Sequence, residues 1–129
     1  MNAITRVLQT VLGMVFLGAG GSKLAALPKQ VEAFEHFGLP DWFRRAIGSL
    51  EILGAVGMHV GLVRRRLAAF ASVGISAVLL GAISTHLRER DSVRHLALPT
   101  ALLGINTLVG WRAVRALRVH GGAGKPGQV

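Results

Sequence analysis

The sequence predicts an all-α integral membrane protein, an antiparallel bundle of four transmembrane helices with a short amphipathic interfacial helix between the first two spans. Of the 129 residues, 51% are hydrophobic and only 16% are charged, and the mean hydropathy is +0.50. That leaves too few charged side chains to cover a soluble domain. The apolar residues also fall into four runs, each long enough at about 20 residues to cross the hydrocarbon core of a bilayer.

The four expected spans cover about residues 3–27, 42–63, 67–86 and 96–117. At 1.5 Å of rise per residue, each run reaches across about 30 Å of hydrocarbon. The first run is too long for the apolar core of a cleaved signal peptide. We therefore expect one membrane domain over residues 1–118.

Residues 29–37 connect the first two spans and place Val31, Phe34 and Phe37 at helical spacing. The polar residues of this segment fall on its other faces, which predicts a short helix lying at the level of the lipid headgroups. Gly38 is suited to end that helix because glycine readily adopts the left-handed conformation.

The fourth span is expected to carry Pro99 in its first turn, where the missing N–H costs little. The residues after it, 119–129, are rich in glycine and include Pro126. We expect this segment to be a disordered cytoplasmic tail.

The basic residues predict the orientation of the spans. One side of the expected bundle holds only basic residues: Arg6, Arg64, Arg65, Arg66, Arg112, Arg115, Arg118 and Lys125. The other side mixes basic residues with acids. Cytoplasmic loops are enriched in Lys and Arg, so the triple-arginine turn favours both termini in the cytoplasm of a multi-pass protein, with a bacterial plasma membrane as the expected location.

Three ionisable residues fall inside or at the outer ends of the spans, where such residues are costly and therefore mark candidate sites. These are Lys23, Glu51 and His86, one on each of three spans. Side chains tilt towards the N-terminus of their helix. Lys23 and His86 therefore lean into the membrane and Glu51 leans outwards, so the three can converge as a ligand-binding cluster in the outer leaflet.

A structural reading of these residues stays open at this point. Glu51 could form an ion pair with Lys23 or Arg44, Lys23 could extend to the headgroups, and His86 could be an interfacial side chain. Glu51 shares a helix face with small residues and with Met58, which predicts that it points into the bundle.

Close helix contacts are expected at a second set of residues. Gly54, Gly57 and Gly61 are small enough to let helix backbones approach, within the bundle or towards a partner. Asn106 is expected to hydrogen-bond between helices.

Several other functions are excluded or disfavoured. The chain has no cysteine, which excludes thiol relays and iron–sulfur ligation by this chain. Its net charge of +9 lies at the ends of apolar runs with no aromatic stacking platform, which argues against nucleic acid. His59 and His86 lie near opposite ends of their spans, too far apart for one haem iron. No metal site is expected, because His36, His86 and His95 match no standard ligand spacing.

Four motifs resemble the DoxX-like family of small four-helix membrane proteins: GGSKL at residues 20–24, FGLP at 37–40, GSLEILG at 48–54 and GAISTHL at 81–87. The resemblance extends over most of the chain. It implies a compact antiparallel bundle in which Lys23, Glu51 and His86 are recurrent polar positions. Relatives are linked to membrane redox systems, including quinone-coupled sulfur oxidation, or to the assembly of partner membrane proteins.

Two functional hypotheses follow from this resemblance, and they leave open whether the protein is an enzyme. In the first, it is a redox-associated subunit that binds a quinone-like or other small ligand at the Lys23, Glu51 and His86 cluster. No cofactor is evident from the residues themselves, so a partner would supply electrons. In the second, it is a non-enzymatic accessory or assembly protein. Its partners would be the lipid bilayer and a membrane protein or a second copy of itself.

Overall fold

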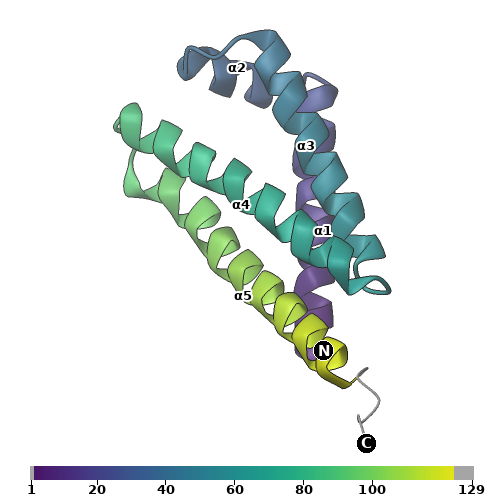
Figure 1. The fold of residues 1–129 in the computed structure, drawn as a ribbon. Coiled ribbons are helices and arrows are strands. Elements are labelled where there is room, and N and C mark those ends of the chain that lie inside the picture. Colours follow the sequence, from purple (N-terminus) through teal and green to yellow (C-terminus); the bar gives the residue numbers. More distant parts are fainter. Residues whose placement is uncertain (1, 124–129) are drawn as a thin grey trace, which may run out of the picture.

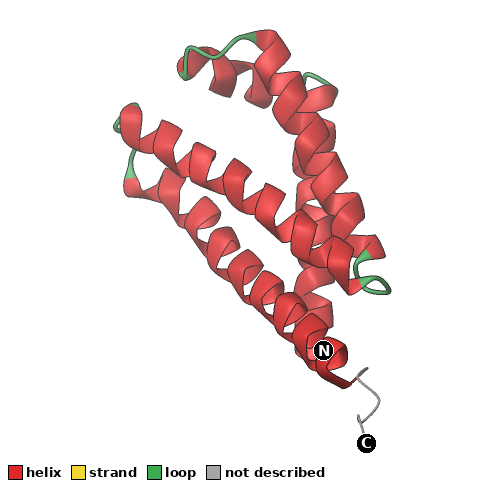
Figure 2. Cartoon of the chain, viewed as in Figure 1, coloured by secondary structure: helices red, strands yellow, loops and turns green. Residues whose placement is uncertain are grey.

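The computed structural model of the protein describes residues 2–123, and these residues form helices joined by short turns (Figure 1, Figure 2). The all-α prediction is confirmed. The helices in chain order are α1 (Ala3–Leu24), α2 (Pro28–His36), α3 (Asp41–Val60), α4 (Arg65–Arg88) and α5 (Val93–Ala123). Within the described residues, α1 and α4 are long and apolar enough to cross a membrane.

The four long helices contact one another around a ring in the order α1, α3, α4, α5, and α5 returns to α1. Short α2 packs on α3 and α1 at one end of the molecule (Figure 1). The same end holds the turn between α4 and α5. The opposite end holds the start of α1, the turn between α3 and α4, and the end of α5.

Three helices end in the same Schellman geometry at the end that carries α2. After α1 the left-handed residue is Ala26 (φ 53°), after α2 it is Gly38 (φ 68°), and after α4 it is Arg90 (φ 54°). In each case the next backbone N–H bonds to a carbonyl in the last turn, which satisfies groups that a helix end would otherwise leave unpaired. This turn ends α1 at Leu24 rather than near residue 27 as expected.

The last helix differs from its expected bounds at both ends. It begins at Val93, so Pro99 lies in the helix interior rather than in the first turn, and its ring removes one backbone hydrogen bond. The helix continues to Ala123, so the prediction of a disordered tail from residue 119 is wrong for residues 119–123. The remainder of the expected tail, 124–129, lies outside the described residues.

The interior combines an apolar core with polar contacts between helices. The core cluster is formed by Leu12, Phe16, Ala55, Met58, Ile75, Leu79 and Val109. The Gln9 Nε2 donates to the Met58 carbonyl at 2.7 Å and so joins α1 to α3. The Asn106 Nδ2 donates to the Ser72 carbonyl at 2.9 Å, and the Ser72 hydroxyl donates to the Asn106 carbonyl at 3.0 Å. Asn106 therefore joins α5 to α4.

Candidate functional site

The centre of the candidate site is an ion pair between α1 and α3. Lys23 Nζ lies 3.0 Å from Glu51 Oε2, and the two side chains are 13% and 6% exposed. Apart from this contact, the same carboxylate oxygen has no hydrogen-bond partner among the described residues, so it can accept a further hydrogen bond. The amine and the acid predicted from the sequence are thus brought together.

A close crossing of two glycines produces this pair. A Cβ atom placed on Gly20 would lie 2.7 Å from the Gly48 carbonyl oxygen, and one on Gly48 would lie 3.0 Å from Lys23 Cβ. The backbones of α1 and α3 therefore touch where neither has a side chain. The lysine stem runs past Gly48 and places its ammonium on Glu51, one helical turn further along α3.

The spacing of α3 predicts which face is buried, and the structure buries that face. Its buried residues are Arg44, Gly48, Glu51, Gly54, Ala55 and Met58. Arg44, however, does not reach Glu51. Its Nε donates to the Lys23 carbonyl at 3.0 Å and its guanidinium pairs with Asp41. Arg44 thus holds the last turn of α1 against α3, and Lys23 is the partner of Glu51.

His86 bonds to a different acid. Its Nδ1 lies 2.7 Å from Asp91 Oδ2. The Schellman turn that ends α4 explains this contact, because the Asp91 N–H also bonds to the His86 carbonyl at 3.0 Å. Arg90 in the left-handed conformation folds the chain back and delivers the carboxylate to the imidazole.

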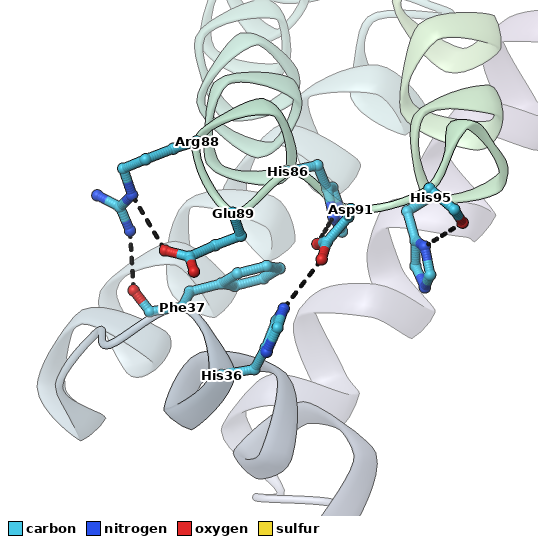
Figure 3. A network of polar contacts seen from close by, with 8 residues as sticks. His36, Phe37, His86, Arg88, Glu89, Asp91 and His95 are labelled. Atoms are coloured by element: carbon cyan, nitrogen blue, oxygen red, sulfur yellow. Dashed lines mark hydrogen bonds and ion pairs between the residues drawn. The ribbon is translucent and has the colours of Figure 1, made fainter.

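Asp91 joins the end of α2 to the end of α4 (Figure 3). Its other oxygen, Oδ1, lies 3.0 Å from His36 Nε2 at the end of α2. Both imidazoles donate, because an ionised carboxylate only accepts. These hydrogen bonds lower the pKa of Asp91, and the bond from His86 has the larger effect.

Two further contacts strengthen the link between α2 and α4, and a third joins α4 to α5. Arg88 donates to the Phe37 carbonyl at 2.8 Å, from the end of α4 to the turn after α2 (Figure 3). The Phe37 ring meets the His86 ring edge-on, with centroids 5.0 Å apart. His95 stacks on the other side of the cluster, with its centroid 5.5 Å from that of His86. Despite these imidazoles, no three His, Asp or Glu side chains in the described part of the chain are placed to hold a metal ion.

A cavity of about 400 Å³ adjoins these contacts and shares Phe37 and His86 with them. Lys23, Glu51 and His86 all contribute to its wall. The remainder of the wall is mainly apolar and comes from α2, α3, α4 and the turn between α2 and α3. It includes the rings of Phe34, Phe37 and Phe43. None of the described lining residues belongs to α5. The cluster is therefore one cavity wall with two separate polar centres, the Lys23–Glu51 pair and the His86–Asp91 pair.

Sequence reasoning does not assign Asp91 or the three phenylalanines to the site. Asp91 carries a weak signal, as an acid in a loop that is otherwise rich in arginine. Its position depends on the left-handed Arg90, which nothing in the residue type indicates. The expected headgroup-level helix places Phe34 and Phe37 on its lipid-facing side, whereas they line the cavity.

The predicted packing glycines lie between α3 and α4. A Cβ on Gly54 would lie 2.8 Å from Ile75, one on Gly57 would lie 2.8 Å from Ala71 Cβ, and one on Gly61 would lie 2.6 Å from Ala68 Cβ. These three glycines let α4 approach α3 closely, so they serve packing within the bundle rather than contact with a partner.

Comparison with known proteins supplies the family. A family model described as the DoxX-like family matches residues 7–109. A Bacillus subtilis (strain 168) protein named "Uncharacterized protein YdgD" is 36% identical over 91 residues, which cover 70% of this chain and 80% of YdgD. Another protein of that strain, named "Putative oxidoreductase CatD", is 30% identical over 81 residues, covering 63% of this chain and 58% of CatD. No solved structure matches the chain significantly. The chain belongs to the DoxX-like family.

Proposed function

We propose that the protein is a four-span membrane protein that binds a small quinone-like ligand in the cavity between α2, α3 and α4 and serves as a redox-associated subunit. The cavity carries this proposal, because one wall joins three aromatic rings to a buried ion pair whose carboxylate oxygen can accept a further hydrogen bond. A binding site of this kind is mostly apolar with a few convergent polar groups.

Membrane placement rests on the distribution of side chains. Large apolar residues are exposed along all four long helices, for example Val11, Leu53, Val73 and Leu108, whereas Gln9, Glu51 and Asn106 are buried. Exposed apolar surface of this extent marks contact with lipid or protein. Helix α3, with 20 residues, and α5, with 31, are also long enough to cross a bilayer and pack beside α1 and α4, so all four would span together. The arginines of the α3–α4 turn support cytoplasmic termini.

The residues of the cavity fit a quinone by their donor set. A quinone supplies reversible two-electron, two-proton chemistry when bound. The Lys23 ammonium has three N–H donors and uses one towards Glu51, so it can donate to a ligand carbonyl. Glu51 Oε2 can accept from a hydroxyl, and Asp91 fixes the His86 ring by holding Nδ1–H. The His86 Nε2 is then an acceptor in the neutral ring and a donor in the protonated ring.

Similarity to CatD adds support, because that protein is named "Putative oxidoreductase CatD". The chain spans 58% of CatD. We extend from CatD only the redox class of the ligand.

The test uses Trp42 as a reporter. Its ring lies 5.7 Å from that of Phe43, which lines the cavity. Quinones quench indole fluorescence, so a quinone bound in the cavity should quench Trp42. The Trp111→Phe substitution removes the other tryptophan and leaves Trp42 as the single reporter. Titration of the detergent-solubilised protein with decylubiquinone should give saturable quenching, and the double variant Lys23→Met/Glu51→Gln should bind roughly tenfold or more weakly.

A matched control separates the site from a general charge effect. Lys29 and Glu32 are on α2 and form no part of the cavity wall. The variant Lys29→Met/Glu32→Gln removes the same charges, and its quenching curve should match that of the parent. Equal quenching in both double variants would refute binding at the Lys23–Glu51 pair.

An accessory or assembly role is the second candidate, and exposed small residues favour it. Gly18, Gly74 and Gly104 are exposed, and a Cβ atom added at any of them would meet nothing within 4 Å. Small residues on lipid-facing helix surfaces allow a partner helix to approach closely. Purification in mild detergent distinguishes the two roles: bound quinone supports the redox subunit, and a stoichiometric membrane protein without quinone supports the accessory role.

A further inference from the structure

A second cavity, of about 860 Å³, lies at the end of the molecule opposite to the Lys23–Glu51 pair. Here the start of α1, the α3–α4 turn and the last part of α5 come together (Figure 1). Its wall carries Arg6 from α1 and Arg64, Arg65 and Arg66 from the turn and the start of α4. We call this group the arginine pocket.

Among the described residues, no acid pairs with the side chains of Arg6, Arg64 or Arg66 in the arginine pocket. None of the lining residues is acidic, and the six acids of the chain all lie between residues 32 and 91, on other segments. Several cations facing one cavity repel one another, which favours a bound anion.

The N-terminus of α4 adds to the positive potential of the pocket. The N-cap residue Arg64 makes no capping hydrogen bond with its side chain, and the first turn of α4 holds no acid. A helix N-terminus carries about half a positive charge and disfavours cations. Placing Arg66 in this turn is therefore unfavourable unless an anion lies nearby.

The end of α3 does not need the side chains of Arg64 and Arg66 as caps. Backbone N–H groups already bond to the last carbonyls of that helix: Gly61 to Gly57 at 2.8 Å, Leu62 to His59 at 3.2 Å and Arg64 to Val60 at 2.9 Å. A role in ending α3 therefore does not explain why three arginines follow one another in this turn.

We propose that the arginine pocket binds the phosphate group of an anionic phospholipid. The neighbouring wall supports a lipid over a free phosphate ion. Phe70 and Val63 line the same cavity and are 74% and 85% exposed, so apolar surface for acyl chains lies directly beside the guanidinium groups. Basic pockets between helices on the cytoplasmic face are suited to such headgroups. This inference rests on the proposed membrane placement and is independent of the ligand in the other cavity.

The experiment measures lipid binding by native mass spectrometry of the full-length protein released from nanodiscs of phosphatidylcholine containing phosphatidylglycerol. We expect retention of phosphatidylglycerol over phosphatidylcholine. The variant Arg64→Gln/Arg66→Gln should weaken that retention roughly tenfold for each lost charge-assisted contact. The Arg64→Lys/Arg66→Lys variant keeps both charges and should retain the lipid at an intermediate level.

The control is Arg115→Gln/Arg118→Gln, because these arginines lie on α5 at the same end but outside the pocket. This variant loses the same charge, so equal loss of phosphatidylglycerol in both double glutamine variants would show general surface attraction and overturn the proposal. Displacement of the lipid by inorganic phosphate at low concentration would identify a free anion and also overturn it. Glu51→Gln should leave lipid retention unchanged, which separates this result from the fate of the quinone proposal.

Discussion

Replacing one member of the Lys23–Glu51 pair leaves the other charge buried between α1 and α3 without its partner. We expect Lys23→Met to lower the free energy of unfolding more than Glu51→Gln does. The Glu51 side chain is 6% exposed and pairs with no second cation among the described residues. Lys23 is 13% exposed and, being near the end of α1, can extend its long side chain towards the headgroups.

The magnitude follows from the geometry of the pair. At 3.0 Å, two unit charges attract by about 5 kcal/mol if the effective dielectric constant is about 20. Desolvation of the two ions offsets most of this attraction, whereas removal of one partner from a buried pair costs about 3–5 kcal/mol. We therefore expect a loss of about 3 kcal/mol for Lys23→Met and about 2 kcal/mol for Glu51→Gln. The double variant should lie within about 1 kcal/mol of the wild type.

The assay is equilibrium unfolding of the purified protein in mixed micelles of rising dodecyl sulfate content, followed by tryptophan fluorescence. A double-mutant cycle isolates the coupling between the two sites. Additive losses in the cycle, or single losses below about 1 kcal/mol, would refute the buried ion pair. A double variant that is stable but binds no quinone would show that the pair serves the ligand and is not required by the fold.

Three other predictions follow from the helix ends and crossings. Gly48→Ala should destabilise the protein by about 2 kcal/mol in the same assay, because the new methyl group meets the backbone of α1. Its control, Gly21→Ala, faces open space inside α1 and should instead raise the stability by up to about 1 kcal/mol, because alanine is favoured over glycine in a helix. Ala26→Gly should raise the stability by about 1 kcal/mol, because Ala26 is left-handed and glycine adopts that conformation without strain; no gain on thermal unfolding would contradict the assigned turn. The pKa of Asp91 is lowered by hydrogen bonds from two histidines, so its carboxylate stabilises the fold fully above its ordinary pKa. This contribution is lost as the pH falls through the lowered pKa, and the difference in melting temperature between wild type and Asp91→Asn should shrink there.

The helix faces that meet can be predicted from residue spacing. On α3, residues three and four apart share a face, so the small residues around Glu51 are enough to indicate which side is buried. Lys23 can be placed at the same height because it lies near the end of its span. The contact itself depends on the crossing at Gly20 and Gly48, which spacing permits but does not require.

Other features depend on backbone geometry that residue types do not indicate. Arg90 is left-handed although glycine is the usual residue at such a position, and this turn creates the contact between His86 and Asp91. Likewise, α5 continues through Gly121 and Gly122, although each glycine costs about 1 kcal/mol in a helix. The glycine-rich composition of this segment predicts a disordered tail, whereas the structure continues the helix through it to Ala123.

The cavity proposed to bind a ligand takes no described wall residue from α5, so on this proposal α5 serves the stability of the fold and α2 serves ligand selection. Changes along α5 should register mainly in how much folded protein a cell accumulates, through contacts such as that of Asn106 with Ser72. Substitutions on α2 should change which ligand the cavity binds. Designers who wish to change the ligand preference of this scaffold can therefore vary the three wall residues of α2, Gln30, Ala33 and Phe34, and use the C-terminal helix for immobilisation or labelling.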